Sequence, residues 1–254
     1  MEGAKGTILI QKYLPKINPF ISVELIENIE KWEINKDKYN DYSHIRPDSP
    51  IGDKAVRLEG SDGMLKSVPQ MIEEMKRQNP NSALLITKTK NKQIPRYEDD
   101  GGFAVLFDKD KNVIIELVGK GFDGRELTHG KTVHESYTIP WGKILYIKDK
   151  SNLVKDKDII RHTINQKDYD YDKKERIDFL VKRCKYDKKV LEKKIPKTYK
   201  PVENEIIKKI IEDIIFELYI KKEELSKDGL NYFWVQGNII NGKVEPWELS
   251  TIDF

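Results

Sequence analysis

This 254-residue sequence has very little cysteine and no long apolar run. The single Cys184 cannot form a disulfide within the chain, which excludes a disulfide-stabilised secreted domain and favours a reducing compartment. No apolar run approaches the roughly 20 residues that a membrane-spanning helix needs. The first residues, MEGAKGTILIQKYL, also lack the apolar core and small-residue cleavage site of a signal peptide. We therefore expect a cytoplasmic protein with no membrane association.

The sequence also lacks a clear excess of one charge. Charged residues make up 35% of the chain, but acids nearly balance bases and the net charge is only +3. A dedicated nucleic-acid-binding protein normally has a marked basic excess, so the composition argues against that class. Residues 143–200 are the exception, with 19 Lys and Arg against 10 Asp and Glu. This basic segment is either a solvated helical face or a docking surface for an anionic ligand or nucleic acid. The lack of an aromatic-and-glycine motif of the single-strand-binding kind favours the solvated face.

Strand-like and helix-like patterns follow one another along the chain. Short apolar runs rich in β-branched residues predict strands, whereas apolar residues spaced by three and four predict helices. The expected strands are Ala83–Thr87, Phe103–Phe107 and Val113–Val118, and the expected helices are Ser22–Trp32, Val68–Gln78, Arg176–Cys184 and Glu203–Leu225. Together these elements predict an α+β fold.

A hairpin is expected at the C-terminal end. Asn241–Gly242 lies between apolar runs, and Asn-Gly in that setting is the strongest short-range hairpin signal. The hairpin puts Gln236 on one strand and Glu248 on the other, so that both side chains reach one spot. A carboxylate with a carbonyl oxygen suits a hard cation such as Mg²⁺. The alternative is an ordinary hairpin whose polar side chains face water.

Two further segments are candidates for phosphate binding. Arg46 precedes a loop rich in Pro, Ser and Gly, and its guanidinium fork suits bidentate contact with phosphate, although it could instead pair with Asp48 or Asp53. The run from Val113 leads into a loop with Gly119, Gly121 and Gly124, in which backbone N–H groups could form an anion-binding nest. The same glycines could equally be turn residues.

Two other chemistries find little support in the residue spacing. His129 and His134 are separated by four residues, whereas the helical zinc motif needs three, and Cys184 has no cysteine partner. No Gly-x-Ser-x-Gly elbow is present for a serine hydrolase. We therefore expect neither a transition-metal site nor a catalytic Ser-His-Asp triad.

Taken in chain order, these segments resemble the nucleotide-binding ATP-grasp module of phosphoenolpyruvate synthase and pyruvate phosphate dikinase. Gly3-Ala4-Lys5-Gly6 is similar to the Gly-Gly-Lys-Gly motif of that family, and Ile45-Arg46-Pro47-Asp48-Ser49 to its Val-Arg-Ser-Ser segment. Residues 59–68 match its phosphate loop more loosely, and 103–107 with 113–130 match its strand pair ending in Gly-Glu-x-Val-Val-x-Gly. The hairpin matches the one that carries the metal ligands of the family. The resemblance is collinear over nearly the whole chain.

The resemblance implies an ATP-grasp-like α+β fold of two lobes, with mainly antiparallel sheets and flanking helices. Residues 1–67 would form an N-terminal lobe, and residues 68–254 a C-terminal lobe that includes the basic segment as an insert. The implied cofactors are ATP and Mg²⁺. The implied nucleotide contacts are Lys5, Arg46, Glu116, Gly119, Gly121 and Gly124, the implied metal ligands are Gln236, Glu248 and Glu245, and the implied catalytic residues are Arg46 and Glu248.

The chain departs from the family pattern at the metal pair. The family has an acidic ligand, eleven residues and then Gln, whereas here Gln236 comes first and Glu248 second, and Ser250 replaces the usual Asn. Glu245 could serve as the second carboxylate. The resemblance implies Mg-dependent phosphoryl transfer or ATP-dependent ligation, with a small molecule or a separate chain as acceptor. The exchanged pair keeps open a catalytically inactive nucleotide-binding or scaffold module, and the basic segment keeps open nucleic-acid binding.

Overall fold

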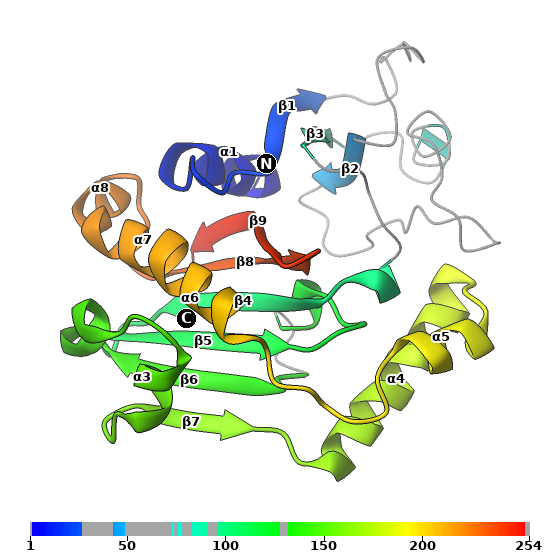
Figure 1. Ribbon diagram of the computed structural model, residues 1–254. Coiled ribbons are helices and arrows are strands. Elements are labelled where there is room, and N and C mark those ends of the chain that lie inside the picture. The colour runs from blue at the N-terminus through cyan, green and yellow to red at the C-terminus, as the bar shows by residue number, and fades with distance from the viewer. Residues whose placement is uncertain are drawn as a thin grey trace.

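The computed structural model describes residues 2–26, 43–48, 73, 76–77, 83–90, 96–127 and 132–251. Within these ranges, the largest element is a six-stranded antiparallel sheet with the order β7-β6-β5-β4-β8-β9, stacked from bottom to top in Figure 1. Its strands are β4 (Gly101–Phe107), β5 (Asn112–Val118), β6 (Glu135–Pro140), β7 (Ile160–Thr163), β8 (Phe233–Ile240) and β9 (Lys243–Thr251). Flanking helices complete the expected α+β class.

Local turn chemistry accounts for the two hairpins of this sheet. In the β4–β5 hairpin, Asp108 Oδ1 accepts the N–H of Asn112 at 2.7 Å, and Lys111 takes a positive φ of 60°. In the β8–β9 hairpin, Asn241 and Gly242 have φ values of 50° and 69°. Two consecutive positive φ values match the type I′ turn that Asn-Gly favours. The predicted C-terminal hairpin is therefore confirmed.

Two cores lie on opposite faces of the sheet. The alternate residues Phe103, Val105 and Phe107 of β4 face the long C-terminal helical stretch, while Ala104 faces the cluster that contains α4 and α5.

The predicted helix from Glu203 is confirmed as a nearly continuous helical run with a π-helical segment in the middle. The helices are α3 (Lys150–Lys155), α4 (Gln166–Cys184), α5 (Lys188–Lys194), α6 (Asn204–Lys209), the π-helix η5 (Ile210–Phe216), α7 (Glu217–Ile220) and α8 (Lys222–Lys227), with the 3₁₀ segments η2 (Arg96–Glu98), η3 (Gly124–Glu126) and η4 (Trp141–Tyr146). Across the described ranges, we find no helix that combines the length and apolarity needed to cross a membrane.

A second, three-stranded antiparallel sheet corrects one prediction. Its order is β1-β3-β2, with β1 (Phe20–Ile26), β2 (Ser43–Asp48) and β3 (Ala83–Thr89). The segment from Ser22 was expected to be helical, but it belongs to β1 and pairs with β3 from Phe20 to Ile26. Ile21, Val23 and Leu25 satisfy strand alternation, whereas Val23, Ile26 and Ile29 satisfy helical spacing. Pairing with β3 decides in favour of the strand.

The N-terminal segment connects the two sheets. Helix α1 (Glu2–Tyr13) packs against β9 and also contacts β1 and β2 (Figure 1). Strand β3, which follows residue 67, is the central strand between β1 and β2. Elements from both sides of the expected lobe boundary therefore share one sheet. Of the expected helix Val68–Gln78, residues 73, 76 and 77 are helical and the others lie outside the described residues.

Candidate functional site

A row of mostly polar side chains crosses the face of the large sheet that carries Ala104. Strand register pairs Glu116 with Ala104, Ala104 with Gln236, and Gln236 with Glu248. Directly paired residues of antiparallel strands point to the same face, about 5 Å apart. We call the full set the polar row: His162, Ser136, Glu116, Ala104, Gln236 and Glu248, one from each strand from β7 to β9.

Gln236 is the most buried polar side chain of the row. It is 3% exposed, and its Nε2 lies 3.4 Å from Glu248 Oε2, at the outer limit of a hydrogen bond. Its carbonyl oxygen Oε1 is buried without a hydrogen-bond partner among the described residues. A buried, unsatisfied polar atom costs about 1–3 kcal/mol, so Oε1 calls for an explanation. An oxygen in this state can accept a donor or coordinate a cation.

Glu245 lies beside this pair. It is paired with Asn238, two residues along β8 from Gln236, which corresponds to about 7 Å. The register between β8 and β9 shifts between Gln236 and Gly237. Because of this irregularity, Glu245 and Glu248 stand opposite residues of the same face although they are three positions apart. The three predicted metal ligands are thus neighbours on one sheet face.

Carboxylates alone do not form a metal site here. In the described part of the chain, no group of three or more His, Cys, Asp or Glu side chains is placed to hold a metal ion. A cation at the hairpin would therefore need the amide oxygen of Gln236 and oxygens supplied by a ligand, such as phosphates. Mg²⁺ is commonly held in this way, through one or two carboxylates together with substrate phosphates.

Glu116 lies in the same row but apart from the metal pair. Two strand spacings, about 10 Å, separate it from Gln236, with Ala104 between them. Burial raises the pKa of Glu116 because the charged carboxylate loses hydration. Glu116 and Glu248 therefore cannot bind one cation together, although both face the same side of the sheet.

The N-terminal motif lies close to Glu248. A β-carbon on Gly6 of α1 would lie 3.0 Å from the backbone oxygen of Leu249 and 3.1 Å from Glu248 Cγ. Glycine therefore allows the helix to approach β9 closely, which offsets its low helix propensity. Lys5 directly precedes Gly6, and its side chain lies outside the described residues. Arg46 is within β2, paired with Leu85, and its side chain is likewise outside them. The loosely matched loop at 59–68 is not described.

The glycine-rich loop makes close contacts within the protein. The backbone N–H of Gly119 donates to His134 Nδ1 at 3.0 Å, and that of Gly121 donates to the backbone oxygen of Asp99 at 2.9 Å. The backbone N–H of Gly124 donates to Asn238 Oδ1 at 3.0 Å. All three predicted nest amides therefore have acceptors within the chain. A nucleotide could contact them only if these hydrogen bonds were exchanged.

A buried arginine, which the sequence patterns did not single out, holds this loop against α4. Arg176 Nε donates to the Gly121 oxygen at 3.0 Å, and its guanidinium lies 3.1 Å from Glu126 Oε1 and 3.4 Å from Asp123 Oδ2. Arg176 and Asp123 are almost completely buried, so removing either partner would leave an uncompensated charge. In the sequence, Arg176 is one of many basic residues of the segment 143–200, and nothing there distinguishes it.

His134 and Glu135 are also buried. His134 packs against the rings of Phe122, Tyr169 and Tyr199, and burial lowers its pKa to about 4. The Nε2 atom of His134 lies 3.7 Å from Asp172 Oδ2, beyond hydrogen-bonding distance. The residue therefore remains a neutral core histidine at neutral pH. His129, the other histidine of the predicted spacing, lies outside the described residues.

Glu135 joins three segments on the other face of the sheet. Its carboxylate accepts from the Tyr137 hydroxyl, from the Tyr199 hydroxyl at 2.8 Å and from the Val202 amide at 3.2 Å, and it lies 2.6 Å from Lys150 Nζ. Every oxygen of this buried carboxylate is thus satisfied within the protein. We assign Glu135 a structural role.

The basic segment has the features of a solvated face over an apolar stripe. Ile177, Leu180 and Leu191 of α4 and α5 are buried, while most lysines around them are exposed. Several of these lysines pair with acids: Lys143 with Asp156 and Asp158, Lys188 with Glu192, and Lys194 with Glu98. The mixture of charges reduces the basic character that the count of lysines suggested.

Neither models of known protein families nor a search of curated proteins produced a match to this chain.

Proposed function

We propose that this protein binds Mg·ATP on the polar row of the large sheet, in the manner of an ATP-grasp module. The observation that carries the proposal is the buried Oε1 atom of Gln236, which lacks a hydrogen-bond partner among the described residues. The Nε2 atom of the same amide lies 3.4 Å from Glu248 Oε2, so a rotation of the amide would turn Oε1 towards that carboxylate. Coordination of a hard cation would satisfy this oxygen.

The metal would be held at the β8–β9 hairpin. Gln236 Oε1 and a Glu248 oxygen would be its protein ligands, with Glu245 nearby as a further carboxylate and nucleotide phosphates as the remaining ligands. Lys5, next to Gly6 beside Glu248, and Arg46 would neutralise the phosphate charge. Glu116, about 10 Å from Gln236, would contact the nucleotide away from the metal.

In such a site, catalysis consists mainly of positioning and charge neutralisation. The reaction class is Mg-dependent phosphoryl transfer or ATP-dependent ligation to an acceptor oxygen or nitrogen. A second candidate is nucleotide binding without turnover. It is favoured by the neutral amide of Gln236 opposite Glu248, because one carboxylate fewer weakens the hold on a catalytic Mg²⁺.

The test is a calorimetric titration of Mg·ATP into the wild-type chain and into Glu248→Gln. We expect wild type to bind, and Glu248→Gln to lose most of the Mg²⁺-dependent part of the affinity. Glu223→Gln, a substitution on the exposed face of α8, is the matched control and should bind as wild type does. Equal Mg·ATP affinity in wild type and Glu248→Gln would rule out the hairpin as the metal site.

A second measurement separates turnover from binding. Release of ADP from ATP and Mg²⁺, with acceptor candidates added in turn, would identify an enzyme. Binding without ADP release under all of these conditions would favour the inactive nucleotide-binding module.

A further inference from the structure

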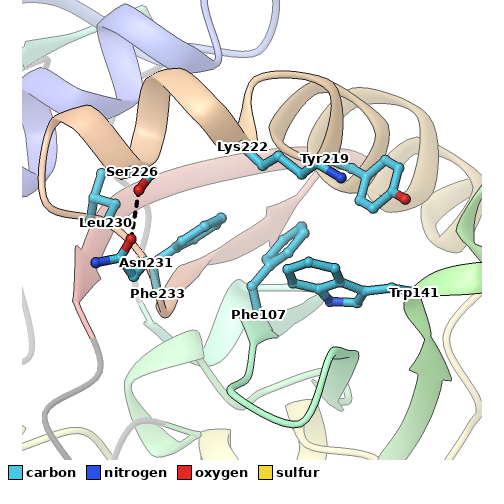
Figure 2. A pocket seen from close by; sticks show the side chains of 8 residues that line it. All are labelled: Phe107, Trp141, Tyr219, Lys222, Ser226, Leu230, Asn231 and Phe233. Atoms are coloured by element: carbon cyan, nitrogen blue, oxygen red, sulfur yellow. Dashed lines mark hydrogen bonds between the residues drawn. The ribbon is translucent and has the colours of Figure 1, made fainter.

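A cavity of about 190 Å³ lies on the sheet face opposite the polar row, between the ends of β4 and β8 and the C-terminal helices (Figure 2). Phe107 and Phe233, directly paired on these strands, stack with ring centroids 4.5 Å apart. Trp141 at the start of η4 and Tyr219 on α7 meet edge to face at 6.1 Å. We call this cavity the aromatic pocket, because four rings from four elements line it.

Lys222 is the one cationic side chain among the described residues that line the aromatic pocket. Lys222 Nζ lies 4.6 Å from the ring centroid of Tyr219 and 5.6 Å from that of Trp141. No carboxylate of the described residues forms an ion pair with Lys222. Ser226 Oγ donates to Asn231 Oδ1 at 2.6 Å. The NH₂ group of Asn231 is therefore the part of that amide that can donate a hydrogen bond to a ligand. A ligand that complements these groups carries a negative charge.

The size of the cavity limits the ligand to one ring with a small substituent. An apolar protein cavity of about 150 Å³ accommodates benzene. The aromatic pocket, at about 190 Å³, has room for such a ring and a carboxylate group. Its rings offer stacked and edge-to-face contacts, and Lys222 offers a charge-assisted hydrogen bond.

We propose that the aromatic pocket binds a small aromatic carboxylate, with its ring against the aromatic side chains that line the pocket and its carboxylate at Lys222. The site is separate from the proposed nucleotide site. Phe107 and Phe233 point to the face opposite Ala104 and Gln236, because they occupy the alternate positions of the same strands. Failure of one proposal therefore leaves the other unaffected.

The test uses benzoate as the anionic probe and benzyl alcohol as its neutral counterpart, in ligand-observed NMR titrations. We expect benzoate to bind wild type with a Kd near the millimolar range for so small a ligand. Lys222→Met should weaken benzoate at least about tenfold, since a hydrogen bond to a charged group is lost, and should change benzyl alcohol much less. Tyr219→Ala should weaken both probes because it removes one ring wall.

Lys227→Met is the matched control, since Lys227 is an exposed lysine of the same helix α8. It should bind benzoate as wild type does. Three results would overturn the proposal: no benzoate binding at about 5 mM, equal benzoate affinity in wild type and Lys222→Met, or benzyl alcohol binding wild type as tightly as benzoate. The last result would mean an apolar pocket without anion recognition. Circular dichroism of each variant checks that the fold is retained.

Discussion

Gly124 lies so close to Gly237 that a β-carbon on Gly124 would be 2.3 Å from the Gly237 backbone oxygen. The Gly124 loop was a candidate for phosphate binding, and this contact gives its glycine a packing role against β8. Gly102 of β4 also lies too close to this loop for a side chain, because a β-carbon on Gly102 would be 2.2 Å from the Gly124 backbone nitrogen. The loop and the sheet can therefore approach each other only where side chains are absent.

The first prediction follows from this contact. Gly124→Ala should destabilise the fold by about 2 kcal/mol or more, because a backbone-to-backbone clash cannot be relieved by rotating a side chain. Denaturant unfolding measures the change. Gly142→Ala is the control, since a β-carbon at Gly142 has open space around it, and it should change stability by about 0.5 kcal/mol or less. If Gly124→Ala is as stable as Gly142→Ala, the loop has room to move away from β8.

The second prediction concerns the exchanged metal pair. Gln236→Glu should bind Mg²⁺ roughly tenfold more tightly in the presence of ATP, because a second carboxylate adds the charge that a hard cation prefers. Without Mg²⁺, the same variant should be less stable than wild type, since two carboxylates would face each other across β8 and β9. Mg²⁺ titration and thermal unfolding with and without the metal measure both effects. A variant that is destabilised equally in both conditions would indicate an ordinary structural hairpin.

The third prediction concerns Arg46. If its guanidinium contacts the phosphates, Arg46→Lys should weaken ATP binding by about 1–3 kcal/mol, because a point charge replaces a bidentate fork. Calorimetry at fixed Mg²⁺ measures the loss, with circular dichroism to verify the fold. Unchanged ATP affinity in a folded variant would remove Arg46 from the site.

The fourth prediction is a pH dependence that arises from His134. Its pKa is about 4 in the folded protein, against about 6.5 in an unfolded chain, so the unfolded state binds more protons between these values. The stability conferred by neutral His134 is fully present above pH 6.5 and is lost as the pH falls towards 4. The loss amounts to about 3 kcal/mol.

Urea unfolding across this pH range tests the assignment. His134→Gln should show a flatter dependence than wild type, whereas His162→Gln, which replaces an exposed histidine of β7, should follow wild type. Parallel curves for wild type and His134→Gln would show that other groups cause the pH dependence.

Local sequence signals determined several elements correctly. Asn241–Gly242 specified the C-terminal hairpin because few other residues tolerate two successive positive φ values. The apolar stripe from Ile206 to Leu218 specified a buried helical run, since only one face of the helix could avoid water. The strands at 103–107 and 113–118 followed from their short apolar runs of aromatic and β-branched residues and from the short polar turn between them. These signals act within a few residues of one another.

Only the tertiary structure decided the features that depend on distant partners. The segment from Ser22 is a strand because β3 pairs with it, and its own pattern was compatible with either form. Arg176 is distinguished from other basic residues only by the acidic loop that meets it. The polar row depends on register, which places Glu116, Gln236 and Glu248 on one face. Side-chain chemistry can be read along the chain, but which side chains share a face is decided by strand pairing across it.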